Sequence, residues 1–320
     1  MVAMIKAQAK TKLKAKASNM LTADTITKAT SNWSVEITVG MAGRTEDFKR
    51  ILPPATHVSI TFLQGEDGYS TVEVGKRLLA DGMHPAPHIS ARLLTSHDHL
   101  TGITQALRDA KIDEVVIIAG GAKIPLGPFT STQDVLDSGI LQKAGVRRIG
   151  VAGYPEGNPY VRDPKLTEAL AWKNEFAQRE GLEVYIATQF CFDGDKIVAW
   201  EKAIRQAGNR LPIRVGIAGP ATIKTLFRFA QITGVGPSVR FIATHASQDD
   251  KLTMIDTPHR VIAAVSQAMH ADKETKFAGF HYYPFGGLER TAEWAGQVAA
   301  GKITLAKAGG FSVTNVTHEK

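Results

Sequence analysis

Residues 183–217 read EVYIATQFCFDGDKIVAWEKAIRQAGNRLPIRVGI, and this stretch contains one complete unit of a repeating pattern. A run rich in β-branched residues predicts a strand over Glu183–Thr188, and a second such run predicts a strand over Ile213–Ile217. The helical stretch between them ends at Gly208, and glycine is the residue favoured just beyond a helix C-terminus. A strand, a helix, a glycine and a further strand are typical of parallel α/β folds.

The same unit recurs along most of the chain. Further strands are predicted at Val35–Val39, His57–Phe62, Pro87–Ser90, Glu114–Ala119, Arg148–Ala152 and Phe277–Tyr282, and further helical stretches end at Gly82, Gly145 and Gly181. Eight strands that alternate with helices predict an α/β protein, a (β/α)8 TIM barrel. The long interval of residues 234–276 predicts extra helices between strands 7 and 8. The alternative, a doubly wound sheet, lacks the G-x-G-x-x-G fingerprint after an early strand.

Length and charge suggest how the chain is divided. The 320 residues are 43% hydrophobic and 22% charged, which is enough for one large core. We expect a basic N-terminal extension over 1–30, a barrel catalytic domain over 31–305 and a C-terminal tail over 306–320. Part of the net charge of +7 lies in residues 1–20, where five lysines precede the first acidic residue. We interpret this segment as a solvated, partly helical extension rather than a targeting segment or a membrane-surface or nucleic-acid arm, because no aromatic residues interleave the lysines.

The cysteine content and the hydropathy pattern point to a cytoplasmic protein with neither a membrane nor a nucleic-acid partner. Cys191 is the only cysteine, so no intrachain disulfide can form, and no apolar run is long enough for a membrane span. We expect Cys191, between two phenylalanines, to be a buried core residue rather than a nucleophile. His97 and His99 are expected in the first turn of a helix rather than around a metal, because side chains at i and i+2 do not face each other.

Polar residues and glycines gather where the predicted strands end. A barrel carries its chemistry at the C-terminal ends of its strands, so these residues are the candidates for a site. They are Thr61, His88, Gly120, Tyr154, Gln189 and, within the first strand, Glu36. A carboxylate in an apolar strand costs several kcal/mol when it is unpaired. Glu36 therefore needs a partner or a function.

Two segments carry a family resemblance. Thr188–Asp193 (TQFCFD) is similar to the T-Q-F-x-F-D segment of methylenetetrahydrofolate reductases, and Tyr154–Pro159 (YPEGNP) is similar to their Y-P-E-x-H-P loop. Three shorter matches occur in the family order: Val35-Glu36-Ile37, Pro87-His88-Ile89 and Phe280-His281-Tyr282-Tyr283. The resemblance extends over roughly residues 33–294.

The resemblance implies a flavin barrel that acts on folate. In this family FAD carries hydride between a nicotinamide nucleotide, NAD(P)H, and 5,10-methylenetetrahydrofolate, which gives 5-methyltetrahydrofolate, and we expect a homo-oligomer. Glu36 matches the general acid that assists opening of the folate ring. Such an acid needs a raised pKa to hold a proton near neutral pH. Gln189 matches the glutamine that contacts the pterin. The positions that match flavin contacts are Thr61, His88, Gly120, Tyr154 and Lys173.

The last predicted strand and the helix after it offer two further substrate contacts. His281, Tyr282 and Tyr283 are candidates for an aromatic wall beside a pterin or nicotinamide ring. For Tyr282 core packing is the alternative, because alternate strand residues face opposite sides. Arg290 is a candidate contact for the glutamate tail of the substrate, with the exposed start of a helix as the alternative.

The chain also departs from the family pattern. The family R-G-D at the end of the fourth strand is absent from Ile118–Lys123 (IAGGAK), the loop histidine is Asn158, and a substrate-stacking phenylalanine falls at Ile223. Loss of a carboxylate beside a developing cation costs several kcal/mol unless another group replaces it. Three alternatives therefore stand beside the usual reaction: oxidation of 5-methyltetrahydrofolate in a catabolic pathway, direct hydride transfer from NADH without flavin, and a non-redox folate-binding or methyl-transfer protein.

Overall fold

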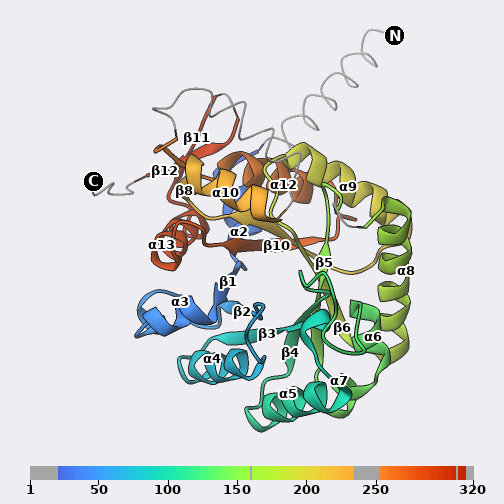
Figure 1. Ribbon diagram of the computed structural model, residues 1–320. Helices are drawn as coiled ribbons and strands as arrows, with labels where there is room; N and C mark the ends of the chain where they lie inside the picture. The colour runs from blue at the N-terminus through green and yellow to red at the C-terminus, as the bar shows by residue number, and fades with distance from the viewer. Residues whose placement is uncertain (1–20, 159–160, 234–251, 308, 315–320) are drawn as a thin grey trace, which may run out of the picture.

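The computed structural model describes residues 21–158, 161–233, 252–307 and 309–314, and it shows a closed barrel (Figure 1). Eight parallel strands form the barrel in the order β1-β10-β7-β6-β5-β4-β3-β2. They are β1 Ser34–Thr38, β2 His57–Thr61, β3 His84–Ser90, β4 Glu114–Ile118, β5 Arg148–Gly153, β6 Glu183–Thr188, β7 Ile213–Ala218 and β10 Phe277–Tyr283. The predicted TIM barrel is confirmed. The five lysines of the basic segment lie outside the described residues.

Helices cover the outside of the barrel. They are α2 Ala23–Thr30, α3 Val39–Arg44, α4 Tyr69–Ala80, α5 His97–Asp109, α6 Thr132–Asp137, α7 Ile140–Lys143, α8 Asp163–Glu180, α9 Gly194–Gln206, α10 Ile223–Thr233, α12 His259–Ala271 and α13 Leu288–Ala299, with short 3-10 turns at Phe48–Arg50 and Ala91–Leu93. The four glycines predicted to end helices have positive φ angles, between 64° and 101°. Within the described residues, no helix combines the length and the apolar character needed to span a membrane.

The interval between strands 7 and 8 contains extra elements, as predicted. Within its described part, a short strand precedes each of α10 and α12, and these strands, β8 Ala221–Thr222 and β9 Ile255–Asp256, pair in antiparallel fashion. After α13, β11 Ile303–Leu305 pairs with β12 Phe311–Val313, and β12 contacts α12 and α13.

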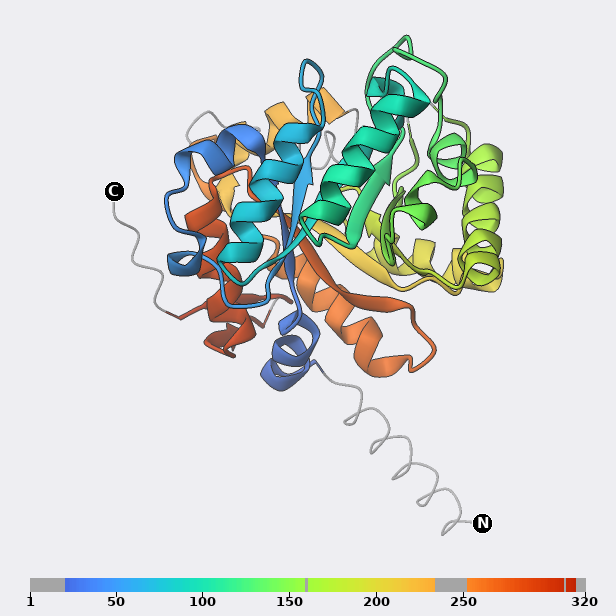
Figure 2. The same cartoon turned by 90° about the horizontal axis from the view of Figure 1, so that it is seen from below.

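Helix α2 packs against the barrel although it falls within the predicted extension 1–30. It contacts α12, α13 and β10, and it lies beside α12 in Figure 2. Thr22 caps its first turn, and Ile26 and Ala29 are buried. Residues 23–30 therefore pack as part of the barrel, because this helix has an apolar face.

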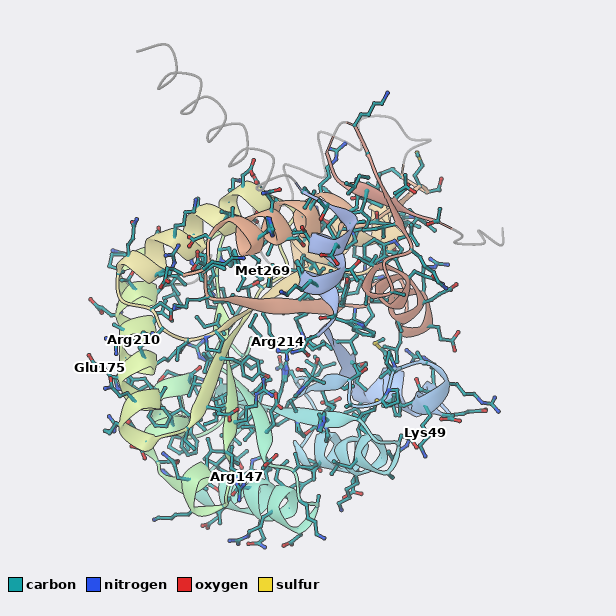
Figure 3. All side chains as sticks on the ribbon, turned by 180° about the vertical axis from the view of Figure 1, so that it is seen from behind. Lys49, Arg147, Glu175, Arg210, Arg214 and Met269 are labelled. Carbon is teal, nitrogen blue, oxygen red and sulfur yellow. The ribbon has the colours of Figure 1, made fainter. Side chains whose placement is uncertain are left out.

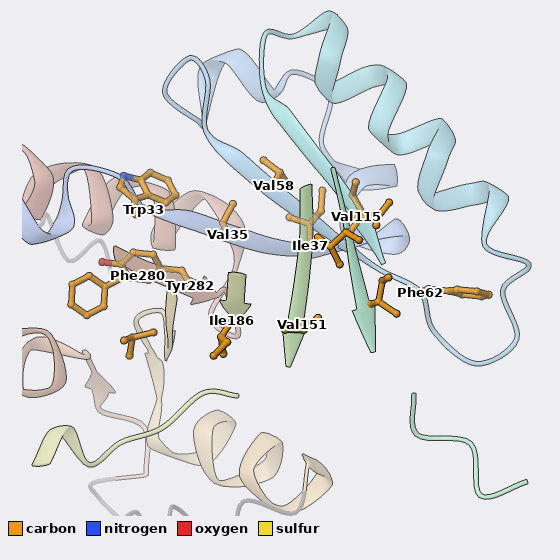
Figure 4. Close-up of a cluster of buried hydrophobic side chains, with 14 of the residues drawn as sticks. Trp33, Val35, Ile37, Val58, Phe62, Val115, Val151, Ile186, Phe280 and Tyr282 are labelled. Carbon is orange, nitrogen blue, oxygen red and sulfur yellow. The ribbon is translucent and has the colours of Figure 1, made fainter. Parts of the chain in front are cut away.

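The hydrophobic core lies between the strands and the helices (Figure 4). In β1, Val35 and Ile37 are fully buried in this core. Because alternate residues of a strand face opposite sides, Glu36 faces the barrel interior. The pattern of the first strand thus brings one carboxylate inside the barrel.

A second polar group inside the barrel lies at the opposite end, where the strands begin. Glu114, the first residue of β4, accepts a hydrogen bond from the Tyr185 hydroxyl at 2.8 Å, and its other oxygen lies 3.1 Å from His57 Nδ1. Arg148 Nη1 lies 3.6 Å from the same oxygen. Arg214 is buried nearby, with its guanidinium 6.0 Å from the centre of the Tyr185 ring (Figure 3). We assign this group to stability, because barrel chemistry lies at the other end of the strands.

Replacing Glu114 with Gln tests that assignment. Burial raises the pKa of Glu114, but His57 and Arg148 outweigh burial and hold it below its ordinary value. A lowered folded-state pKa gives stability that is present above the unfolded-state pKa, about 4.3, and is lost as pH falls through the folded value. We expect the variant to lose roughly 1–3 kcal/mol of unfolding free energy at pH 7, measured in urea, and less below about pH 4. An equal loss at both pH values would contradict this account.

Candidate active site

Glu36 lies between two histidines inside the barrel. Its Oε2 is 3.5 Å from His88 Nε2, on β3, and 3.9 Å from His281 Nε2, on β10. His281 Nδ1 is 2.9 Å from the hydroxyl of Ser34, two residues before Glu36 on β1. Both histidines are more than nine-tenths buried, whereas the Glu36 side chain is 21% exposed. The carboxylate is therefore the part of this cluster that a ligand can reach most easily.

The histidines change the acidity of Glu36. Burial raises its pKa, but His281 and His88 outweigh burial and hold the pKa below its ordinary value. The pKa of His88 is also below its ordinary value, chiefly because burial disfavours its charged form. The expectation of a raised pKa for Glu36 is wrong for this arrangement, because it left out two imidazoles contributed by β3 and β10. The carboxylate is ionised at neutral pH, and two imidazoles are its nearest titratable neighbours.

The backbone of Gln189, directly after β6, is held from several sides. Its N–H donates to the Gly153 carbonyl at 2.9 Å, and its own carbonyl accepts from the Thr188 hydroxyl at 2.9 Å and from the Cys191 thiol at 3.3 Å. Burial raises the pKa of Cys191 well above its ordinary value, so the thiol stays protonated. Cys191 is confirmed as a buried residue, and its role here is structural.

The register between β1 and β10 decides which tyrosine faces the interior. Tyr282 pairs with Val35, and His281 pairs with Ser34. Paired residues of neighbouring strands point to the same side, so Tyr282 faces the helices and His281 faces the interior.

Tyr282 is not a substrate contact in this structure. It is fully buried, with its ring edge-on to Trp33 at 5.7 Å and packed against Trp294 at 6.3 Å. The core alternative for Tyr282 is the correct one. Tyr283, another residue of the predicted aromatic wall, instead faces the interior. Its ring lies edge-on to His281 at 5.1 Å, and its hydroxyl donates to the Thr188 carbonyl at 2.9 Å.

Two predicted flavin residues, Thr61 and His88, lie at the Glu36 carboxylate, and a third, Gly120, follows β4. Thr61 ends β2, and its buried hydroxyl contributes to the lowered pKa of Glu36, while His88 Nε2 lies 3.5 Å from the carboxylate. Gly120 follows β4 with φ 86°, and a Cβ there would lie 3.3 Å from Ser90 Cβ. The left-handed backbone and the close approach both favour glycine at this position.

The loop after β4, which lacks the R-G-D segment, is held by Arg92. The Arg92 guanidinium donates to the carbonyls of Thr130 at 2.9 Å and Ala122 at 3.3 Å. The Arg92 backbone also bonds to Ala119 and Leu126. The loop is thus ordered by backbone contacts, without a charged side chain of its own beside Gly120.

The other two predicted flavin residues, Tyr154 and Lys173, line one cavity. This cavity, of about 770 Å³, runs between α8 and α9 from the loop after β5 toward Arg210. In α8, all of whose residues are described, only Phe176 is buried, so the helix leaves space beneath its N-terminal half. In the C-terminal half of α8, the Asn174 side chain accepts a hydrogen bond from the backbone N–H of Arg210 at 2.7 Å. Arg210 and the neighbouring Glu175 are labelled in Figure 3.

Lys173 is a cation without a counter-charge in the described structure. It is half-buried on α8, and burial lowers its pKa to about 8. Among the described residues, no charged or hydrogen-bonding partner contributes to this shift, which burial alone causes. A lysine in this state is suited to an anionic ligand, because the ligand's charge would favour the protonated form.

The remaining predictions concern residues on the surface. Arg290 is exposed in the first turn of α13, which agrees with the alternative of a helix start. His97 begins α5, and His99 faces the loop after β2, where its Nε2 lies 2.8 Å from the Asp67 carbonyl. Ile223, at the start of α10, lines a second cavity of about 150 Å³ together with Cys191 and His259.

The fold and the site define a TIM-barrel protein with a buried carboxylate–histidine cluster and a separate cavity beside a lysine. The family model described as methylenetetrahydrofolate reductase matches residues 126–285, half of the chain. The protein therefore belongs to the methylenetetrahydrofolate reductase family.

Two individual proteins show the extent of the similarity. Methylenetetrahydrofolate reductase 1 of Schizosaccharomyces pombe is 35% identical over 96 residues, which cover 30% of this chain but only 15% of that protein. An uncharacterized Clostridium thermocellum protein, solved with two copies of 5-methyl-5,6,7,8-tetrahydrofolic acid, has a TM-score of 0.55 and 12% identity, and the match covers 87% of this chain and 98% of that chain. This second similarity is one of fold.

Proposed function

We propose that the protein interconverts 5,10-methylenetetrahydrofolate and 5-methyltetrahydrofolate, with a nicotinamide nucleotide as the hydride donor or acceptor. The observation that carries the proposal is the Glu36–His88–His281 cluster inside a barrel of this family. Opening the five-membered ring of the folate requires a proton on the departing nitrogen, and closing it requires that proton to be removed. A carboxylate next to an imidazole can both supply this proton and remove it.

The proton path follows from the contacts of His281. Its Nδ1 lies beside the Ser34 hydroxyl, and its Nε2 faces Glu36. A substrate that covers Glu36 excludes water from the carboxylate, and desolvation favours the protonated form. In our proposal Glu36 takes up a proton through His281 as the substrate covers it, and it then gives that proton to the departing nitrogen. Gln189 binds the amide-like edge of the pterin, because a carboxamide offers both a donor and an acceptor.

Hydride transfer needs a cofactor, because no side chain supplies hydride. FAD, when bound, would supply this chemistry by accepting hydride from NAD(P)H and passing it to the folate. The residues present fit part of such a cofactor: Tyr154 and Lys173 line the 770 Å³ cavity, and Lys173 offers an uncompensated cation for a phosphate. Thr61, His88, Gly120, Tyr154 and Lys173 would hold it.

A second candidate is direct transfer from NADH to the folate without flavin. The loop after β4 favours this candidate, because Ala119, Gly120 and Gly121 offer no charged side chain where the family has R-G-D. The same loop leaves open a folate-binding protein without redox activity.

The visible spectrum of the purified protein, followed by a titration with FAD, separates these routes. A flavin band that shifts on binding supports the FAD route. A colourless protein that fails to bind FAD but oxidises NADH only when folate is present supports direct transfer. Folate binding in calorimetry without nucleotide oxidation by either route would leave only the non-redox alternative and would contradict the proposed reaction.

A further inference from the structure

Tyr283 contacts both halves of the candidate site. Its hydroxyl donates to the carbonyl of Thr188, the residue directly before Gln189, and its ring lies edge-on to His281, the partner of Glu36. One side chain thus connects the segment that carries Gln189 to the proton-transfer pair.

The contact between Tyr283 and Thr188 depends on Gly216 in β7. A Cβ at Gly216 would collide with the carbonyl oxygens of Thr188 and Gln189, and it would lie 2.9 Å from Cε2 of Tyr283. The Gly216 N–H also donates to the Thr188 hydroxyl at 2.8 Å. The end of β6 is therefore held between the β7 backbone and the Tyr283 hydroxyl, and only glycine leaves room for this approach.

Aromatic packing restricts movement of the Tyr283 ring. Phe285 stacks on it, with ring centres 5.9 Å apart and planes inclined by 17°, and Phe190 packs at 5.6 Å with planes inclined by 64°. The hydroxyl of a ring held in this way has few alternative positions. A hydrogen bond from a fixed donor costs little side-chain entropy.

We propose that Tyr283 is a positioning residue that fixes Gln189 relative to the Glu36–His281 pair. The two ends of the reacting ring system, the amide-like edge and the departing nitrogen, are then bound in one geometry. This inference rests on the proposed function, because it takes Gln189 as the contact for the pterin.

The test compares two neighbouring tyrosines. Tyr283→Phe removes the hydroxyl that bonds to Thr188. Tyr282→Phe removes a buried hydroxyl that has no hydrogen-bond partner among the described residues. We expect Tyr283→Phe to weaken 5-methyltetrahydrofolate binding roughly tenfold in calorimetry, the effect of one lost hydrogen bond, and to raise KM more than it lowers kcat. Tyr282→Phe should leave both unchanged, and both variants should melt within a few degrees of the parent protein.

A double substitution separates positioning from general loosening of the structure. If Tyr283 acts through Gln189, adding Tyr283→Phe to Gln189→Ala should cause no further loss of folate affinity. If the two losses of folate affinity multiply in the double variant, or if Tyr283→Phe alone leaves folate affinity unchanged, the inference is overturned. If Gln189→Ala itself binds folate as tightly as the parent protein, the assignment of Gln189 in the proposed function fails instead.

Discussion

Replacement of Glu36 with glutamine is expected to lower folate turnover by roughly 10²- to 10⁴-fold, the usual contribution of a general acid–base group. Glutamine keeps the size of the side chain but cannot exchange a proton with His281. Folate binding should change far less than turnover, because the loss concerns proton transfer. Anaerobic stopped-flow mixing with folate measures the effect.

The control for Glu36 is Glu73→Gln, a carboxylate on the exposed side of α4. It should have no effect on turnover. If flavin is bound, its reduction by NADH should remain nearly intact in Glu36→Gln. If the reduction of bound flavin by NADH fell as much as folate turnover, the role of Glu36 as the proton donor would be contradicted.

Replacement of Lys173 with glutamine is expected to weaken the binding of FAD by about 10- to 100-fold, as for loss of a hydrogen bond from a charged group to a phosphate. Burial lowers the pKa of Lys173 to about 8, and phosphate binds the protonated form. The affinity of the parent protein should therefore be constant below about pH 8 and should fall as pH rises above it. The affinity of the variant should not follow this profile.

Lys165→Gln is the matched control for Lys173, because Lys165 is an exposed lysine in the first turn of the same helix. Fluorescence titrations with FAD at several pH values, repeated with NADH, measure the effect. If Lys165→Gln weakens binding as much as Lys173→Gln, the cavity is not the phosphate site. If the affinity of the parent protein for FAD does not change with pH, the assignment of Lys173 is contradicted as well.

The barrel itself could be predicted from the sequence because its strands are short β-branched runs separated by helices that end at glycine. All eight strands were found close to their observed bounds. The main difference is β3, which begins at His84 rather than Pro87 because His84 and Pro85 pair with the start of β2. The prolines at 85 and 87 hid the strand, since proline is disfavoured within sheets.

The candidate site could be predicted only in part. Glu36 is visible in the sequence because a carboxylate interrupts an apolar strand. Its acidity was not predictable, because His281 lies 245 residues away and its contact depends on barrel closure. Alternation along the last strand showed that Tyr282 and Tyr283 face opposite sides, but only the register with β1 shows which faces the interior. The cavity beside Lys173 depends on how loosely α8 packs, which no sequence pattern reports.

The most direct test of the proposed function is nucleotide oxidation by the purified protein in the presence and absence of 5,10-methylenetetrahydrofolate. The assay is run with and without added FAD, and the reverse reaction is measured from 5-methyltetrahydrofolate. Our account predicts oxidation or reduction of the nucleotide that depends on folate and that disappears in Glu36→Gln. No folate-dependent change of the nucleotide in either direction, with FAD supplied, would contradict it.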